Sequence, residues 1–128
     1  MDITWKYKIP LSNSDVFSEI EGKYSIPDEL KKFLAEANAA TPSKIHFMVG
    51  ATERIFGAVL SYNKEDTDVD SVFTALNAIS DKTLVPFGID PFGNYICLSN
   101  QKVVFWDHEN ESISPTDLTL PDFIASLY

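Results

Sequence analysis

The chain has few cysteines, few basic residues and no long apolar run, and each of these scarcities excludes a class of protein. A single cysteine, Cys97, allows no intrachain disulfide, so the sequence does not indicate a disulfide-stapled secreted scaffold. No apolar stretch approaches the roughly 20 residues of a membrane helix. The first residues lack the basic-then-apolar pattern of a signal peptide. We therefore expect a cytoplasmic protein with no membrane partner.

Basic residues are scarce as well, since 10 Lys+Arg stand against 19 Asp+Glu and give a formal net charge of −9. Residues 1–44 hold six basic and seven acidic side chains, whereas residues 45–128 hold four basic and twelve acidic ones. The acidity therefore lies in the C-terminal two-thirds. Nucleic acids and anionic membranes attract basic surfaces, so we expect neither as a partner. A basic protein partner fits the charge, and so does plain solubility.

Catalytic and ligand-binding motifs are also missing. The five glycines never reach the spacing of a phosphate-binding loop, and no Gly-x-Ser-x-Gly elbow is present. His46 and His108 lie far apart and pair with no second His or Cys at metal-ligand spacing. Asp107 and Glu109 flank His108, but neighbours on an extended strand point to opposite faces. We therefore predict neither an enzyme nor a metal or cofactor site.

The acidic segment 65–70 superficially resembles the opening of a calcium-binding loop. Counted from Asp66, however, the sixth position is Ser71 and the twelfth is Asn77, where such a loop has Gly and Glu. We interpret the segment as an exposed acidic face before a helix.

The apolar spacing predicts four helices and a series of strands in a single domain, residues 1–128. Helical spacing of apolar residues covers about 12–22, 27–38, 69–79 and 119–127, and strand-like runs cover 45–49, 55–60, 83–88, 95–98 and 103–106. Asp90-Pro91-Phe92-Gly93 has the composition of a type I turn that closes a hairpin. This order predicts an α+β fold, with a mostly antiparallel sheet of about five to six strands and helices on one side and at the ends.

Local signals also predict where the helices begin and end. Ser12, Asn13 and Ser14 offer N-caps for the first helix, and Gly22 can stop it. Pro27 suits the first position of the second helix, and Asn38 can end that helix in a left-handed conformation. For the third helix we expect Asp68 or Asp70 as the cap, and the last helix should begin near Thr119, with Pro121 in its first turn.

Four motifs in order resemble a known family. They are Ile26-Pro27-Asp28-Glu29-Leu30-Lys31-Lys32-Phe33-Leu34 with the following Asn38, Pro86-Phe87-Gly88-Ile89-Asp90 with Gly93-Asn94-Tyr95-Ile96-Cys97-Leu98, Val103-Val104-Phe105-Trp106-Asp107-His108-Glu109, and Phe123-Ile124-Ala125-Ser126-Leu127. Together they resemble the SUKH superfamily, which includes yeast cell-wall-synthesis regulators of the Smi/Knr type and bacterial toxin-immunity proteins. The chain departs from the family pattern at Asn38-Ala39-Ala40, where Asn-Gly-Gly is common, and at Gly93-Asn94, where Gly-Asp is frequent.

The resemblance implies a small bacterial immunity protein that binds a cognate toxin, often a nuclease, and blocks it. The alternative within the family is an intracellular regulatory module of the Smi/Knr type. A nuclease presents a basic substrate cleft, so an acidic inhibitor would associate with it rapidly. The expected contacts are exposed acids with an aromatic anchor: Tyr62, Glu65, Asp66, Asp68, Asp70, Trp106, Glu109 and Glu111. A homodimer through an exposed sheet edge is also possible.

Overall fold

The computed structural model describes residues 3–12, 16–21, 26–66 and 68–128. Within them the helices are α1 (Ser18–Glu21), α2 (Asp28–Ala37), α3 (Val72–Ala78) and α4 (Leu120–Ser126). The strands are β1 (Trp5–Lys6), β2 (Thr41–Pro42), β3 (His46–Val49), β4 (Thr52–Ile55), β5 (Ala58–Val59), β6 (Val85–Ile89), β7 (Tyr95–Ser99), β8 (Lys102–Trp106) and β9 (Ile113–Thr119).

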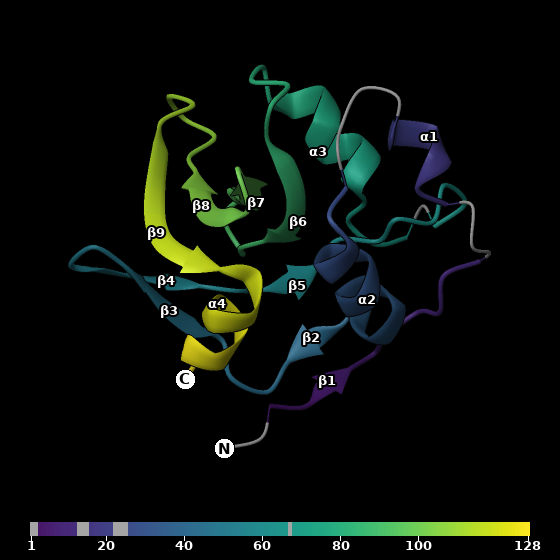
Figure 1. Ribbon diagram of the computed structural model, residues 1–128, viewed down its shortest axis with the longest axis horizontal. Helices are drawn as coiled ribbons and strands as arrows, with labels where there is room; N and C mark the ends of the chain where they lie inside the picture. Colours follow the sequence, from purple (N-terminus) through teal and green to yellow (C-terminus); the bar gives the residue numbers. More distant parts are fainter. Residues whose placement is uncertain (1–2, 13–15, 22–25, 67) are drawn as a thin grey trace.

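A five-stranded antiparallel sheet in the order β5-β6-β7-β8-β9 forms the centre of the fold (Figure 1). From β6 onward each strand pairs with the next one in the sequence, which makes a meander. The β7–β8 turn places Asn100 and Gln101 at positive φ, the geometry of a two-residue hairpin turn. Gly93 in the β6–β7 loop also has positive φ, as the turn motif predicts. The expected α+β class with a mostly antiparallel sheet is confirmed.

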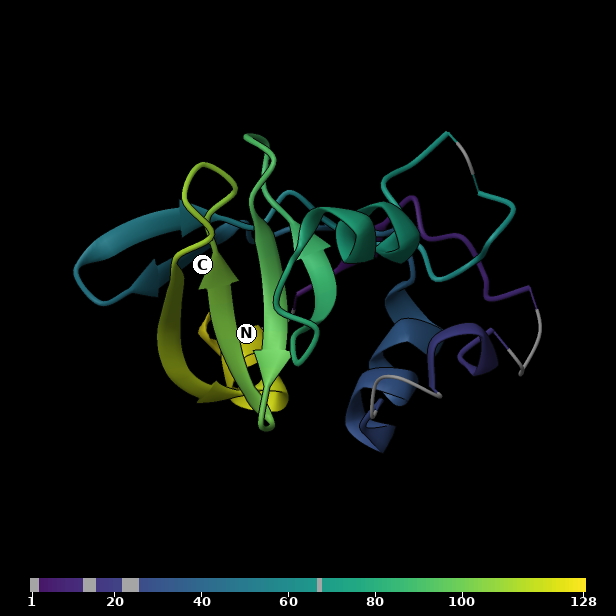
Figure 2. The same ribbon diagram turned by 90° about the horizontal axis from the view of Figure 1, so that it is seen from above.

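Helices lie against both faces of this sheet. Side chains alternate along β7, so that Ile96 and Leu98 join one buried cluster while Tyr95 and Cys97 join a second. The first cluster includes buried residues of α2 and α4 together with Val72 of α3, and the second includes Ala75 of α3. We expected helices on one side and at the ends, and α3 in addition contributes to the clusters on both faces. Figure 2 shows α3 in teal beside the strands and α4 in yellow behind them.

Phenylalanine rings fill the first face. The rings of Phe56 and Phe87 lie 6.1 Å apart, and Phe123 of α4 lies 6.0 Å from Phe56 and 6.2 Å from Phe87. All three side chains are fully buried. A Cβ on Gly88 would lie 2.8 Å from the Phe56 ring, so only a glycine in β6 allows this ring to approach the sheet. Burial of such rings is the main stabilising contribution to this face.

Two small two-stranded sheets extend the fold beyond the central sheet. β1 pairs with β2 across a long connection that contains α1 and α2, and β3 and β4 form a hairpin. Tyr128 extends the β3–β4 sheet, because its backbone N–H donates to the His46 carbonyl and its carbonyl accepts from the His46 N–H, both at 3.0 Å. The C-terminal residue therefore acts as a third strand position beside β3.

The helix boundaries correct three local predictions. Pro27 is the N-cap of α2 rather than its first helical residue. The left-handed residue after α2 is Ala39 at φ 63°, whereas Asn38 has φ −54°. The N-cap of α3 is Ser71, whose hydroxyl accepts from the backbone of Thr74, and not Asp68 or Asp70.

The other two helices bear on the remaining boundary predictions. Thr119 caps α4 as expected, with Pro121 in the first turn. Asn13, Ser14 and Gly22, predicted to bound the first helix, lie outside the described residues. Ser12 lies six residues before Ser18, where α1 begins, so it does not cap this helix.

The buried side chain of Asn38 joins the end of α2 to the segments around Ile9 and Tyr62. Its Oδ1 accepts from the Tyr62 backbone N–H at 2.8 Å, and its Nδ2 donates to the Ile9 carbonyl at 3.0 Å and to Ser61 Oγ at 3.3 Å. Asn63 extends this network, since it donates to the Pro10 carbonyl at 2.9 Å. A side chain committed to these tertiary bonds explains why Asn38 does not take the left-handed position.

Candidate protein-binding surface

Two loops lie side by side at one end of the central sheet. They are residues 90–94 between β6 and β7 and residues 107–112 between β8 and β9. Alternate turns of an antiparallel meander lie at the same end of a sheet, and Figure 2 shows both loops above the strands. Hydrogen bonds between the loops fix their relative position.

The first loop is ordered by Asp90. This side chain is only 5% exposed, and its Oδ1 accepts from the backbone N–H groups of Phe92 at 2.9 Å and Asn94 at 2.8 Å. Its Oδ2 accepts from Asn94 Nδ2 at 2.8 Å. Charge-assisted bonds of this kind are strong, so the carboxylate holds the turn in one conformation.

Asn94 then joins the two loops. Because its Nδ2 donates to Asp90, its Oδ1 faces His108 as an acceptor. Oδ1 accepts from the His108 backbone N–H at 3.0 Å and lies 2.7 Å from His108 Nδ1. Nδ1 must therefore carry the proton, and in the neutral ring Nε2 is left as an unprotonated acceptor.

Phe92 occupies the tip of the first loop and is 66% exposed. Sequence reasoning did not single it out, although the turn motif contained the signal. The third residue of an Asp-Pro-x-Gly turn lies away from the strands, so an aromatic ring there faces solvent. Large exposed aromatic rings on rigid supports are typical of binding hot spots.

Glu111 anchors the second loop to the end of α3. Its carboxylate oxygens accept from the Ser80 N–H and hydroxyl, both at 2.9 Å. These bonds hold the pKa of Glu111 below its ordinary value, with a smaller contribution from the charge of Lys82. The Lys82 ammonium itself donates to the Leu76 and Ile79 carbonyls at 2.6 Å, so it closes the C-terminal end of α3. The Glu111 carboxylate is thus already engaged within the molecule.

The family model of the SMI1/KNR4 family (SUKH-1) matches residues 11–126. This chain belongs to the SMI1/KNR4 family (SUKH-1). The suspected SUKH membership is therefore confirmed over nearly the whole chain. No curated protein and no solved structure matches the chain significantly.

The SUKH-1 fold buries both aromatic side chains that we expected as anchors. Tyr62 is 1% exposed, and its hydroxyl donates to the Pro86 carbonyl at 2.7 Å. Trp106 is 2% exposed and stacks against Tyr95 with ring centroids 5.6 Å apart. The prediction that either one contacts a partner is wrong, because neither ring reaches the surface.

Five of the six predicted acids are exposed and fall into two groups. Glu65, Asp68 and Asp70 are exposed before α3, and Glu109 and Glu111 are exposed in the second loop of the SUKH-1 domain. Asp66 differs from them, because its Oδ2 accepts from Ser61 Oγ at 2.7 Å and Asn63 Nδ2 at 3.0 Å. The structure therefore gives Asp66 a role in holding its own segment in place. The exposed acids flank α3 at its two ends.

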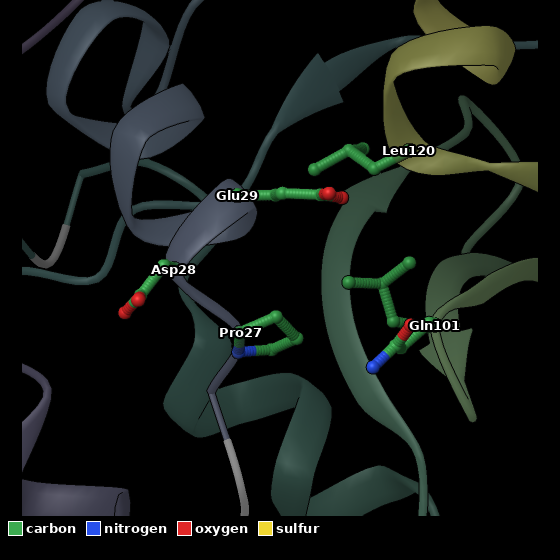
Figure 3. A pocket seen from close by; sticks show the side chains of 6 residues that line it. Pro27, Asp28, Glu29, Gln101 and Leu120 are labelled. Carbon is green, nitrogen blue, oxygen red and sulfur yellow. The ribbon is translucent and has the colours of Figure 1, made fainter.

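A hollow of about 270 Å³ lies between α2, the β7–β8 turn and α4 of this SUKH-1 domain. Its lining residues are Pro27, Asp28, Glu29, Leu98, Gln101 and Leu120. Figure 3 shows the Glu29 side chain extending across the hollow toward Leu120, while the Asp28 carboxylate points away from it. Both acids lie in the first turn of α2, where they also complement the helix dipole. That role alone explains their presence.

Metal binding and thiol chemistry find little support in the described part of the SUKH-1 domain. No group of three or more His, Cys, Asp or Glu side chains among those residues could hold a metal ion. Burial, together with the charge of Asp81, raises the pKa of the Cys97 thiol, so the reactive thiolate is disfavoured. No helix of the described residues is long and apolar enough to span a bilayer.

The β9 edge of the SUKH-1 sheet is poorly suited to pair with a second copy. Pro115 in β9 has no N–H to donate, and Asp117 has a positive φ of 64°. The β8–β9 register also shifts between Lys102 and Val104. Prolines, charges and irregularities on an edge strand oppose further strand addition. These features disfavour a homodimer through the β9 edge and do not bear on the other sheet edges.

Proposed function

We propose that the chain is a bacterial immunity protein, which binds and neutralises a cognate toxin through protein–protein contact. The proposal assigns the toxin to the nucleases, because their substrate clefts are basic and this chain is acidic. Membership of the SMI1/KNR4 family (SUKH-1) supports an interaction protein. The partner contacts assigned to it are Glu65, Asp68, Asp70 and Glu109.

The observation that carries the proposal is the placement of the exposed acids. Glu65, Asp68 and Asp70 form an acidic patch before α3, and Glu109 lies in the second loop, which Glu111 binds to Ser80 just after this helix. An acidic surface of this extent raises the association rate with a basic partner.

Co-expression with the toxin domain encoded beside this chain tests the proposal. Cells that express the toxin should survive only when the wild-type chain is present, and the two purified proteins should form a complex. Because the attraction is electrostatic, the association rate should fall steeply as salt is raised from about 0.05 to 0.5 M. The absence of a neighbouring toxin gene, or death despite co-expression, would contradict the proposal.

Charge variants identify the contributing patch. The triple variant Glu65→Gln, Asp68→Asn, Asp70→Asn should slow association about tenfold, because it removes three charges from one patch. The matched control is the triple variant Asp28→Asn, Glu29→Gln, Glu36→Gln, which removes the same number of exposed charges from α2, on another part of the surface. Equal slowing by the control would show that only net charge matters.

A further inference from the structure

The loop end of the sheet presents three exposed side chains on loop segments whose backbone is fixed by internal hydrogen bonds. Phe92 projects into solvent from a turn fixed by Asp90. His108 is exposed and is oriented by Asn94. Glu109 is exposed, and its backbone N–H is fixed by Asp107 Oδ1 at 2.9 Å. A buried Asp and a buried Asn are thus used to order a surface loop.

We propose that Phe92, His108 and Glu109 form a preorganised contact for an arginine of the partner protein and the apolar surface around it. This inference rests on the proposed function and specifies the contact that the toxin makes. This contact adds to those assigned to the acids before α3, which also act on the approach of the partner.

The chemistry of the three groups selects a cation. His108 Nε2 accepts a hydrogen bond when the ring is neutral, because Nδ1 is committed to Asn94 Oδ1. The Glu109 carboxylate accepts and carries negative charge, and the face of the Phe92 ring attracts cations. A guanidinium offers several donors in one plane and stacks on aromatic rings, which suits all three groups. A lysine could not make both the stacked and the forked contacts.

The location of the remaining charges supports the same partner. Glu111 is hydrogen-bonded to Ser80, so it does not compete for the partner's arginine. The Lys82 ammonium is hydrogen-bonded to carbonyls of α3, so it does not occupy the place of that arginine. A Cβ on Gly93 would lie 3.9 Å from His108 Nδ1, so the Phe92 turn passes directly beside the histidine. By contrast, Tyr7, which is 81% exposed, lies between Lys6 and Lys8 in the sequence, and these two lysines would repel a basic partner.

Preorganisation explains the buried polar network. A loop that is ordered before binding loses less conformational entropy in the complex, so more of the contact energy is retained as affinity. Asp90 and Asn94 are positioning residues in this sense, because they act through Phe92 and His108.

The test measures binding of each variant to a catalytically inactive form of the adjacent toxin domain by calorimetry. Phe92→Ala should weaken affinity about 30-fold, as expected of a hot-spot aromatic. His108→Ala and Glu109→Gln should each weaken it about fivefold to tenfold. Tyr7→Ala is the matched control, since it removes an exposed aromatic side chain elsewhere and should change affinity less than twofold. All four substitutions are at exposed positions, and thermal melting confirms that each variant is folded.

A second measurement uses the wild-type chain and needs no variant. Backbone amide NMR signals of residues 90–94 and 107–111 should shift when the inactive toxin domain is added. Unchanged signals there, or wild-type affinity in Phe92→Ala, would overturn the inference while leaving a toxin-binding wild-type chain as an immunity protein. A wild-type chain that binds no toxin would overturn both the inference and the proposed function.

Discussion

Replacement of Asn38 by alanine tests how much of the fold depends on one buried amide. Asn38 is 1% exposed and satisfies the Tyr62 N–H and the Ile9 carbonyl, which belong to segments far from α2 in sequence. Alanine can satisfy neither group. It also removes a donor to Ser61 Oγ, but that hydroxyl keeps bonds with Asn63 and Asp66.

The expected loss of unfolding free energy follows from the two backbone groups that lose their hydrogen-bond partner. A buried polar group without a hydrogen bond costs about 1–3 kcal/mol. The Tyr62 N–H is buried and should carry the larger share, whereas the Ile9 carbonyl is only partly buried and can reach water. We therefore expect Asn38→Ala to lower the free energy of unfolding by about 2–4 kcal/mol. At roughly 4 °C per kcal/mol for a domain of this size, Tm should fall by about 8–16 °C.

Urea unfolding followed by far-UV circular dichroism measures this change. When the denaturant slope m is the same in both proteins, the difference in midpoint multiplied by m is the change in the free energy of unfolding. Asn77→Ala in α3 is the matched control, since Asn77 is exposed and alanine favours helix. The control should stay within about 0.5 kcal/mol of wild type. A loss below about 0.5 kcal/mol in Asn38→Ala would refute the assignment of the amide as the link between these segments.

Three other predictions concern the cap of α3, the second loop and the thiol. Ser71→Ala should cost about 1 kcal/mol of unfolding free energy because it removes an N-cap. Asp70→Asn, one residue earlier, should change that energy by less than about 0.5 kcal/mol, and the opposite order would show that the aspartate is the cap. Glu111→Gln should be less stable than wild type near neutral pH, because the bonds from Ser80 lower the pKa of Glu111 from its ordinary 4.5. That contribution is complete above pH 4.5 and is lost as pH falls through the lowered pKa, so acid melts should bring the two proteins together. Cys97 is fully buried with a raised pKa, and a thiol reagent should label it at the rate of unfolding; rapid labelling of the native protein would contradict this.

Sequence patterns predicted the parts of the fold that depend on local geometry. The apolar stripe of α2 and the turn at Gly93 follow from spacing and φ preference, and the structure contains both. β9 was not predicted, because Pro115 and the left-handed Asp117 break the alternation that marks a strand. It forms only because β8 offers a neighbouring edge, which is a tertiary effect.

The candidate site was harder to predict than the fold. Tyr62 and Trp106 were expected as exposed aromatic anchors, yet packing buries both rings. Burial depends on which segments meet, and local sequence does not contain this information. The exposure of Phe92, in contrast, follows from its place in a turn, and so a closer reading of the turn could have identified it.

The consecutive pairing of β6, β7, β8 and β9 has a consequence for how the chain folds. Hairpins with short loops lose little entropy on closure. The bonds from Ser43 to Thr4 and from Tyr128 to His46 must bring together residues 39 and 82 positions apart. We therefore expect the meander to form first and these two closures to come last and to open first. Native-state hydrogen exchange should then find slow amides in β7 and β8 and fast ones at Ser43 and Tyr128, so that the fold loosens from its periphery while the loops 90–94 and 107–112 stay ordered.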